Sequence, residues 1–347
     1  MEKQLSGFRL GLTFAGCFLG AGYVSGREIW QFFGRFGIWG WFGLIISMSF
    51  LSLFGAVTLF LVRRTGDAAI ERLMIPWNFP FLRGAVSVLS ILFLFGIDII
   101  MTAGVGALFR QFMGLSAAQT GFLFSIAVAL SALTGLEGMI SAFSFLVPFL
   151  TICAFVIGVT ALAILSPVPV SGDYNSTGWV FSAATFAAYN IFGSVAILAP
   201  LGKYADNKQI RRGVAFGVSI LLLTAGLFLL VLNQNASAVA QELPMLSVAE
   251  RLSPFAGWIF AFLLLLAMFG AAFSCFLTGI NQIAARLKFI GLHRKACIFL
   301  FSVLIWLASL FGFGNLMDFL YPAFGCLSAV FLLCMLFHFF LRVESRK

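Results

Sequence analysis

The chain has 347 residues, of which 62% are hydrophobic and only 10% are charged. A soluble domain has about 25% charged residues, so these values exclude a soluble enzyme, a disordered chain and a nucleic-acid-binding domain. Long stretches such as 220–232 are apolar on every side rather than alternating, which argues against a β-barrel. The sequence therefore predicts an all-α integral membrane protein.

Ten apolar segments follow one another along the chain, and each is long enough to cross about 30 Å of hydrocarbon. They are predicted over residues 8–34, 38–62, 82–111, 116–134, 138–166, 178–203, 210–232, 254–286, 296–312 and 315–341. Residues 241–252, between the seventh and eighth segments, have the pattern of a short amphipathic helix at the membrane surface.

The net charge of +9 is explained by membrane topology rather than by an anionic partner. With ten spans and a cytoplasmic N-terminus, most Lys and Arg residues fall on the inner side. This asymmetry predicts a multi-pass plasma-membrane protein of the bacterial inner-membrane type, with both termini cytoplasmic. Six scattered cysteines show no metal-type spacing, so neither a metal site nor a cofactor is expected.

The ten spans divide into two nearly equal halves, residues 1–166 and 178–347, joined by a polar link. Five spans per half is an odd number, so the second half enters the membrane from the opposite side. Inverted repeats of this kind are typical of secondary transporters. A single membrane domain built from two inverted repeats is therefore expected.

The first span of each half contains an interruption. Gly20, Ala21 and Gly22 lie in the GAGYVSG stretch of the first span, and Tyr189 and Asn190 lie in the AAYNIFG stretch of the sixth. Glycine and polar residues at mid-membrane allow the backbone to unwind where it lines a cavity. Close packing of helices through small residues is the alternative explanation.

The segment GCFLGAGYVSGREIWQFFGRFG, residues 16–37, resembles the opening helix of the YkvI-type permeases. These belong to the amino acid–polyamine–organocation superfamily, which shares the LeuT fold. The resemblance implies a 5+5 inverted repeat with helices 1 and 6 broken around a central substrate site, and transport by alternating access.

Candidate site residues follow from the position of polar groups within the spans. Backbone N–H groups of the first break would favour a carboxylate, and carbonyls of the second a substrate amine. The predicted substrate-binding residues are Gly20, Ala21, Gly22, Tyr23, Ser25, Asp98, Tyr189, Asn190 and Phe192. For Asn190 a structural hydrogen bond is an equal alternative.

A coupling ion, H⁺ or Na⁺, is expected to involve Asp98, Ser274 and Thr278. Asp98 lies at mid-membrane, where an unpaired carboxylate is costly, and it could bind a proton or a substrate ammonium. Helix 8 has Ser274 followed by Cys275, whereas sodium-coupled relatives have adjacent Ser/Thr hydroxyls. Cysteine is a poor ligand for a hard cation, which favours H⁺.

An outer gate is predicted from Arg27, Glu28 and Asp318. The resemblance implies that an arginine of helix 1 and an aspartate of helix 10 close the outer side. Arg27 could instead pair locally with Glu28. The sequence shows no paired-carboxylate or nucleophile motif, so an enzyme is not expected.

The expected function is secondary active transport of a small amino acid or related organic amine. The expected partners are therefore this small-molecule substrate and the lipid bilayer, with no nucleic acid. The alternative is a ligand-sensing receptor subunit that keeps a LeuT-like site without transporting, since subunits of bacterial spore germinant receptors resemble the same superfamily.

Overall fold

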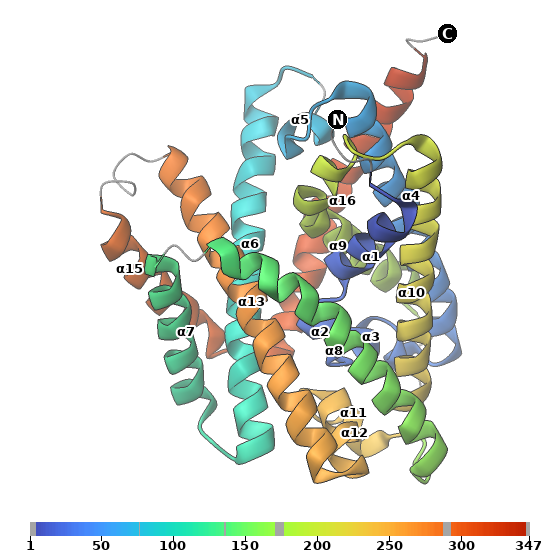
Figure 1. Cartoon of the computed structure of the whole chain (residues 1–347), viewed down its shortest axis with the longest axis vertical. Coiled ribbons are helices and arrows are strands. Elements are labelled where there is room, and N and C mark those ends of the chain that lie inside the picture. Colours follow the sequence, from blue (N-terminus) through green and yellow to red (C-terminus); the bar gives the residue numbers. More distant parts are fainter. Residues whose placement is uncertain (1–4, 76, 135–136, 171–176, 287–292, 345–347) are drawn as a thin grey trace.

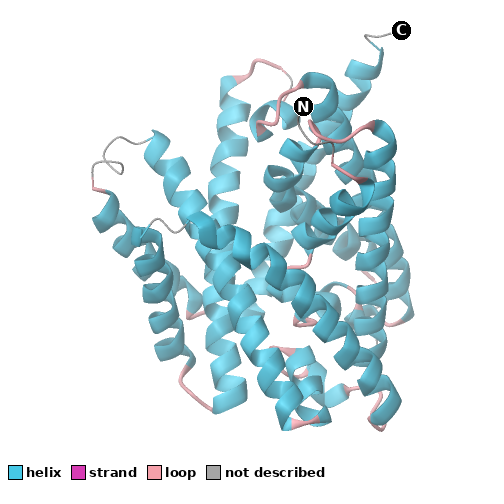
Figure 2. Cartoon of the chain, viewed as in Figure 1, coloured by secondary structure: helices cyan, strands magenta, loops and turns pink. Residues whose placement is uncertain are grey.

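A computed structural model describes residues 5–75, 77–134, 137–170, 177–286 and 293–344. In this part of the chain every one of the ten predicted spans is helical (Figures 1 and 2). The first half contains α1 (Gly7–Phe18), α2 (Ala21–Val24), α3 (Arg27–Phe32), η1 (Gly34–Phe36), α4 (Ile38–Thr65), α5 (Ile70–Met74), α6 (Pro80–Met113), α7 (Ala117–Thr134) and α8 (Glu137–Ile164).

The second half is helical in the same way. It contains α9 (Trp179–Leu201), α10 (Asn207–Asn233), α11 (Ala236–Val239), α12 (Pro244–Leu252), α13 (Pro254–Arg286), α15 (Arg294–Ser309) and α16 (Phe313–Glu344). An isolated bridge joins Val168 to Asn235. The architecture is therefore an all-α bundle, as predicted.

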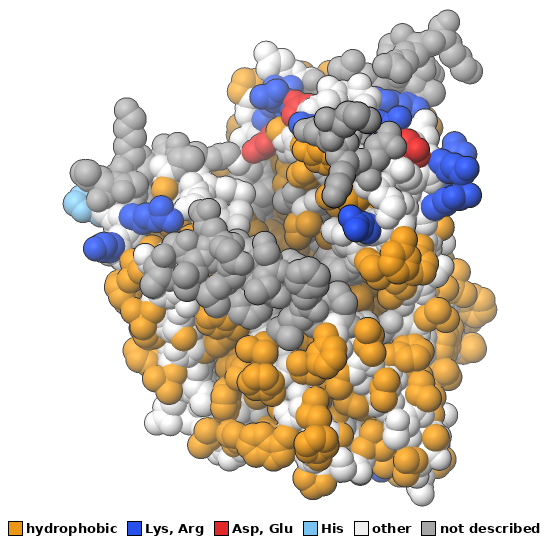
Figure 3. Space-filling view, viewed as in Figure 1, with side chains coloured by type: hydrophobic (Ala, Val, Ile, Leu, Met, Phe, Trp, Pro, Cys, Tyr) orange, Lys and Arg blue, Asp and Glu red, His pale blue; other side chains and the backbone are white. Residues whose placement is uncertain are grey.

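Five of the described helices are long and apolar enough to cross a membrane by length and composition. They are Ile38–Thr65, Pro80–Met113, Asn207–Asn233, Pro254–Ala284 and Phe313–Leu341, and shorter apolar helices cover Ala117–Leu133 and Phe149–Ile164. Figure 3 shows a broad apolar surface below an end where Lys and Arg side chains gather. Large exposed side chains such as Phe81 and Phe262 suit contact with lipid chains.

The first span is divided into α1, α2 and α3, as the glycine-rich sequence predicts. The expected break in the sixth span is not present, because α9 is helical throughout from Trp179 to Leu201. Gly193 has a packing role: a Cβ there would lie 2.6 Å from the Phe93 ring of α6. Asn190 Nδ2 donates to the Phe186 carbonyl of its own helix, 3.0 Å away. Small-residue packing, the alternative explanation, therefore accounts for this sequence.

The inner half of helix 1 packs directly on α10. A Cβ at Gly11 would lie 2.9 Å from the Gly213 carbonyl oxygen, and one at Gly217 would lie 2.8 Å from the Gly11 carbonyl oxygen. Glycine at these positions lets the two backbones meet, as in other close helix crossings. The Leu5 amide also donates to the Tyr204 carbonyl at 2.8 Å, just before α10.

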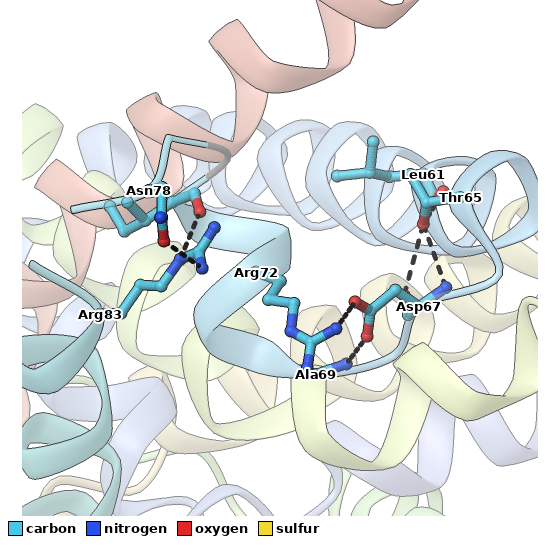
Figure 4. A network of polar contacts seen from close by, with 8 residues as sticks. Leu61, Thr65, Asp67, Ala69, Arg72, Asn78 and Arg83 are labelled. Atoms are coloured by element: carbon cyan, nitrogen blue, oxygen red, sulfur yellow. Dashed lines mark hydrogen bonds and ion pairs between the residues drawn. The ribbon is translucent and has the colours of Figure 1, made fainter. Parts of the chain in front are cut away.

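The loop between α4 and α6 is ordered by Asp67 (Figure 4). Its Oδ1 accepts from the Ala69 amide at 3.0 Å, and its Oδ2 pairs with Arg72 Nη1 at 2.9 Å. The hydrogen bond from the Ala69 amide, together with the charge of Arg72, lowers the pKa of Asp67. Arg83 donates to the Asn78 side chain and the Ile75 carbonyl, which ties α5 to the start of α6.

Candidate functional site

The backbone of helix 1 leaves the α-helical path at Leu19 and Gly20. The Gly20 amide donates to the Phe18 carbonyl at 2.8 Å, and Gly20 adopts extended angles before α2 begins. A second interruption follows at Gly26, whose φ of +81° is left-handed and therefore favours glycine. A Cβ at Gly16 or Gly20 would meet no atom within 4 Å. The backbone at the break therefore has open space beside it.

The carboxylate of Glu28 lies inside the bundle, one short helix beyond the break. Only 4% of this residue is exposed. The Tyr189 hydroxyl of α9 donates to its Oε2 at 2.7 Å, and the Tyr321 hydroxyl of α16 is a second hydrogen-bond donor. The two tyrosine rings stack with their centroids 4.4 Å apart. Oε1 lies directly over Gly22, where a Cβ would overlap it. We call Glu28, Tyr189 and Tyr321 the carboxylate cluster.

Arg27 and Asp318 form an ion pair above this cluster. Arg27 Nη2 lies 3.7 Å from Asp318 Oδ2, and the side chains are 19% and 47% exposed. Gly314 makes the approach possible, because a Cβ there would lie 2.8 Å from Arg27 Nη2. Gln31 Nε2 also donates to the Met317 carbonyl at 3.0 Å. Three side chains of α3, those of Arg27, Glu28 and Gln31, therefore contact α16.

The amphipathic segment expected at the surface is instead packed over helix 1. The Met245 amide of α12 donates to the Ser25 carbonyl at 2.8 Å, and Met245 is fully buried. Arg110 Nη2 pairs with Glu242 Oε2 at 2.6 Å, which ties the end of α6 to the segment before α12. These contacts cover α2 and α3 on the side away from the Lys- and Arg-rich end.

The structure separates Glu28 from the predicted gate. Consecutive helical residues point about 100° apart, so Arg27 reaches Asp318 while Glu28 turns into the bundle. The local pairing of Arg27 with Glu28 is therefore not the arrangement found. Arg27 and Asp318 are brought together as expected, which leaves their role as a gate a proposal.

Several predicted substrate-binding residues make structural contacts. The Tyr23 hydroxyl donates to the Leu221 carbonyl of α10 at 2.6 Å. Ser25 Oγ donates to the Gly22 carbonyl at 2.8 Å. The Phe192 ring packs edge-on against Phe93, with centroids 5.7 Å apart. Together with Asn190, these side chains hold helices together, so they are weaker candidates for binding a substrate.

Asp98 is 1% exposed, and its Oδ2 has no hydrogen-bond partner within the described residues. The same holds for Thr102 Oγ1, one helical turn away on α6. Cys275 of α13 lies within electrostatic range of Asp98. The neighbouring Phe95 packs on Phe276 and Phe301, so this face of α6 is directed to α13 and α15. An unpartnered buried carboxylate is an unsatisfied acceptor for a proton or another cation.

The predicted ion-coupling residues of α13 are more open. Ser274 is half-buried and Thr278 is exposed, although both belong to a membrane-spanning helix. Within the described residues no group of three His, Cys, Asp or Glu side chains could hold a metal ion.

Sequence reasoning did not include Tyr321 among the site residues, and it grouped Glu28 with Arg27 and Asp318, whereas the Glu28 carboxylate turns into the bundle. Tyr321 follows Asp318 by three residues on α16, and this spacing puts both side chains on one face of a helix. That spacing is the signal that would have found Tyr321. The hydrogen bonds to Glu28 come from α9 and α16, which are far from it in sequence, and no local pattern reveals them.

The geometry of a broken first helix within this bundle is that of the LeuT fold. MhsT in complex with L-phenylalanine aligns with a TM-score of 0.62 and 17% identity over 96% of this chain and 88% of that chain. The inward-facing conformation of Mhp1 aligns with 0.61 and 14% identity, covering 95% and 76%. A manganese transporter mutant of Eremococcus coleocola gives 0.59 and 14%, covering 93% and 76%.

Two sequence relatives are proteins of Bacillus subtilis strain 168. The uncharacterized membrane protein YkvI is 27% identical over 342 residues, covering 95% of both chains. The uncharacterized protein YyaD is 29% identical over 356 aligned positions, covering 96% of this chain and 97% of its own. No family model matches the sequence.

Proposed function

We propose that the chain is a secondary active transporter of a small amino acid or related organic amine, working by alternating access. The observation that carries this proposal is the break at Leu19 and Gly20. It lies beside open space while α12 and the Arg27–Asp318 pair cover it from one side. A site closed on one side only is what alternating access requires. The relation to transporters of the LeuT fold supports the same conclusion.

The proposed topology places the membrane domain in the plasma membrane with both termini cytoplasmic. The end where Lys and Arg gather in Figure 3, at which α16 ends in Figure 1, is then the inner end. Residues 1–166 and 178–347 form the two inverted repeats. In this orientation the Arg27–Asp318 pair is an outer gate, and the present structure is closed to the outside. The superfamily assignment is the amino acid–polyamine–organocation superfamily.

The proposed substrate site comprises the backbone of Gly20, Ala21 and Gly22, together with Asp98 of α6. The N–H groups that begin α2 suit a carboxylate, and the unpartnered Asp98 suits an ammonium group or a coupling ion. H⁺ is favoured over Na⁺ because Ser274 is followed by Cys275 in α13, and Thr278 lies a full turn away.

The first experiment is a thermal-shift screen of the purified protein against individual amino acids, polyamines and nucleobases, with Na⁺ or K⁺. A ligand of the folded state raises Tm by mass action. Each hit is then tested for counterflow in proteoliposomes. Exchange of labelled ligand across the membrane supports transport, whereas binding without exchange supports the receptor. No hit among amines would contradict the proposed substrate class.

The Asp98→Asn variant tests the role of Asp98 in binding and in gradient-driven uptake of any ligand that the screen finds. If Asp98 carries a coupling proton, gradient-driven accumulation is lost while binding persists. If Asp98 holds the substrate amine, binding is lost too. Strict dependence of uptake on Na⁺ with a fully active Asp98→Asn variant would contradict both roles. Ser274→Ala serves as the matched substitution for a sodium site on α13.

A further inference from the structure

The carboxylate cluster joins three helices, two of which also carry the outer ion pair. Glu28 belongs to α3, Tyr189 to α9 and Tyr321 to α16. Arg27 and Asp318, the residues of the outer ion pair, precede Glu28 by one position and Tyr321 by three. The hydrogen bonds of Glu28 therefore join the same two helices as the ion pair, one layer deeper in the molecule.

The space around Glu28 admits no substrate in this state. Gly22 covers Oε1 so closely that even a Cβ would overlap it, and Tyr189 and Tyr321 hold the carboxylate from α9 and α16. None of the ion pairs within the described residues includes Glu28. A proton is the one cation that can join this carboxylate without displacing its neighbours.

The titratable groups facing Glu28 are tyrosines and a cysteine. They are Tyr23 on α2, Tyr189 on α9 and Tyr321 on α16, with Cys275 of α13 beyond Tyr321. The basic residue on its own helix, Arg27, is engaged with Asp318. The charge of Glu28 is thus stabilised by hydroxyl donors rather than by a cation.

We propose that Glu28 is a proton-binding site whose protonation stabilises the closed outer gate. Burial penalises an ionised carboxylate that has no cation beside it, and two hydroxyl donors offset only part of this cost. The closed gate, in which Glu28 is 4% exposed, therefore favours the protonated acid, whereas an open gate that admits water favours the ionised carboxylate. By linkage, binding of a proton shifts the population toward the closed gate.

The proton step is simple to balance. A proton from outer water bonds to a carboxylate oxygen of Glu28 while the gate is open. On closure the protonated acid is enclosed beside Tyr189 and Tyr321, and the proton passes to water when the inner side opens to Glu28. No electron or further group is transferred. This inference rests on the proposed transport function, for which it supplies the coupling ion and the moving part.

The test uses a reporter cysteine just below the gate, Met317→Cys, in the full-length protein in lipid nanodiscs. Met317 is fully buried beside Asp318, so its thiol reacts with a charged thiosulfonate reagent only when the gate opens. The protein without this reporter, which keeps its native cysteines, provides the background. Because thiol reactivity itself changes with pH, each rate is divided by the rate in Glu28→Gln at the same pH.

The expected ratio approaches one near pH 5.5, where Glu28 is protonated like the amide of Gln, and rises at least several-fold by pH 8.5. Tyr321→Phe keeps the ring stack and removes one donor, so it moves the midpoint of this change to higher pH. Asp67→Asn, on the opposite end of the molecule, leaves the profile unchanged. A ratio that does not change with pH would overturn the inference, as would a midpoint unmoved by Tyr321→Phe.

The outcomes separate this inference from the proposed function. If Asp98→Asn removes the pH dependence of labelling while the ratio to Glu28→Gln stays constant with pH, the proton site is at Asp98 and Glu28 is only a structural contact. Counterflow would then still support transport. If the profile follows Glu28 but no ligand exchanges, the gate is proton-sensitive and the transport proposal fails instead.

Discussion

The first spans of the two halves carry the same sequence signal and fold differently. In helix 1, Gly20 has open space around it, and the chain leaves the helical path. In α9, Gly193 is filled by the ring of Phe93, and the helix continues. Glycine within an apolar span therefore marks either a break or a close contact, and the neighbouring helix decides which.

The largest expected effect is a loss of thermal stability on substitution of Gly193, the glycine packed against Phe93. Gly193→Ala should place a Cβ 2.6 Å from a Phe93 ring carbon, and overpacking of this kind costs about 1–3 kcal/mol. Thermal unfolding in one detergent should show a clearly lower Tm. Gly84→Ala is the matched control, because it adds a Cβ in open space on α6 and should not lower Tm. Equal Tm values for the two variants would show that this contact does not hold α9.

The second prediction concerns the open glycine. Gly20→Leu should change the free energy of unfolding by no more than about 0.5 kcal/mol, because Gly20 is exposed and nothing lies within 4 Å of the position of a Cβ. The same side chain should fill the space beside the break and abolish binding of any ligand found by the screen. Normal ligand binding by a folded Gly20→Leu protein would place the substrate site elsewhere.

A smaller effect is expected from the outer ion pair. Asp318→Asn and Arg27→Gln should each raise labelling of the Met317→Cys reporter. Their coupling in a double-mutant cycle should be about 0.2–1 kcal/mol, because Asp318 is 47% exposed. The Arg110–Glu242 pair provides a second cycle on the α12 cover. Strictly additive effects at Arg27 and Asp318 would exclude a gate made by this pair.

The smallest expected effect is the pH-dependent contribution of Asp67, which lies outside the membrane-spanning helices, to stability. The pKa of Asp67 is lowered by the Ala69 amide and Arg72, so ionised Asp67 stabilises the fold above the pKa it has when unfolded. This contribution should be lost as pH falls through the lowered pKa. Asp67→Asn should therefore reduce Tm slightly at pH 7 and leave it unchanged in strong acid. A larger difference in acid than at pH 7 would contradict this sign.

The positions of the ten helices were predictable because each needs an apolar stretch of fixed length. The division of helix 1 was predictable from its clustered glycines. The continuity of α9 was not, because it depends on Phe93, a residue about a hundred positions earlier. The pairing of Arg27 with Asp318 was found through charge and depth. The enclosure of Glu28 was missed because its donors come from distant helices.

The attachment of helix 1 to α10 has a consequence for movement. The backbone of α1 meets α10 at Gly11, Gly213 and Gly217, and the Tyr23 hydroxyl fastens α2 to Leu221 of the same helix. The segments on both sides of the break are therefore anchored to one continuous helix, α10. We expect α1, α2 and α10 to move together as one rigid unit, and to shift relative to α13 where α2 meets it.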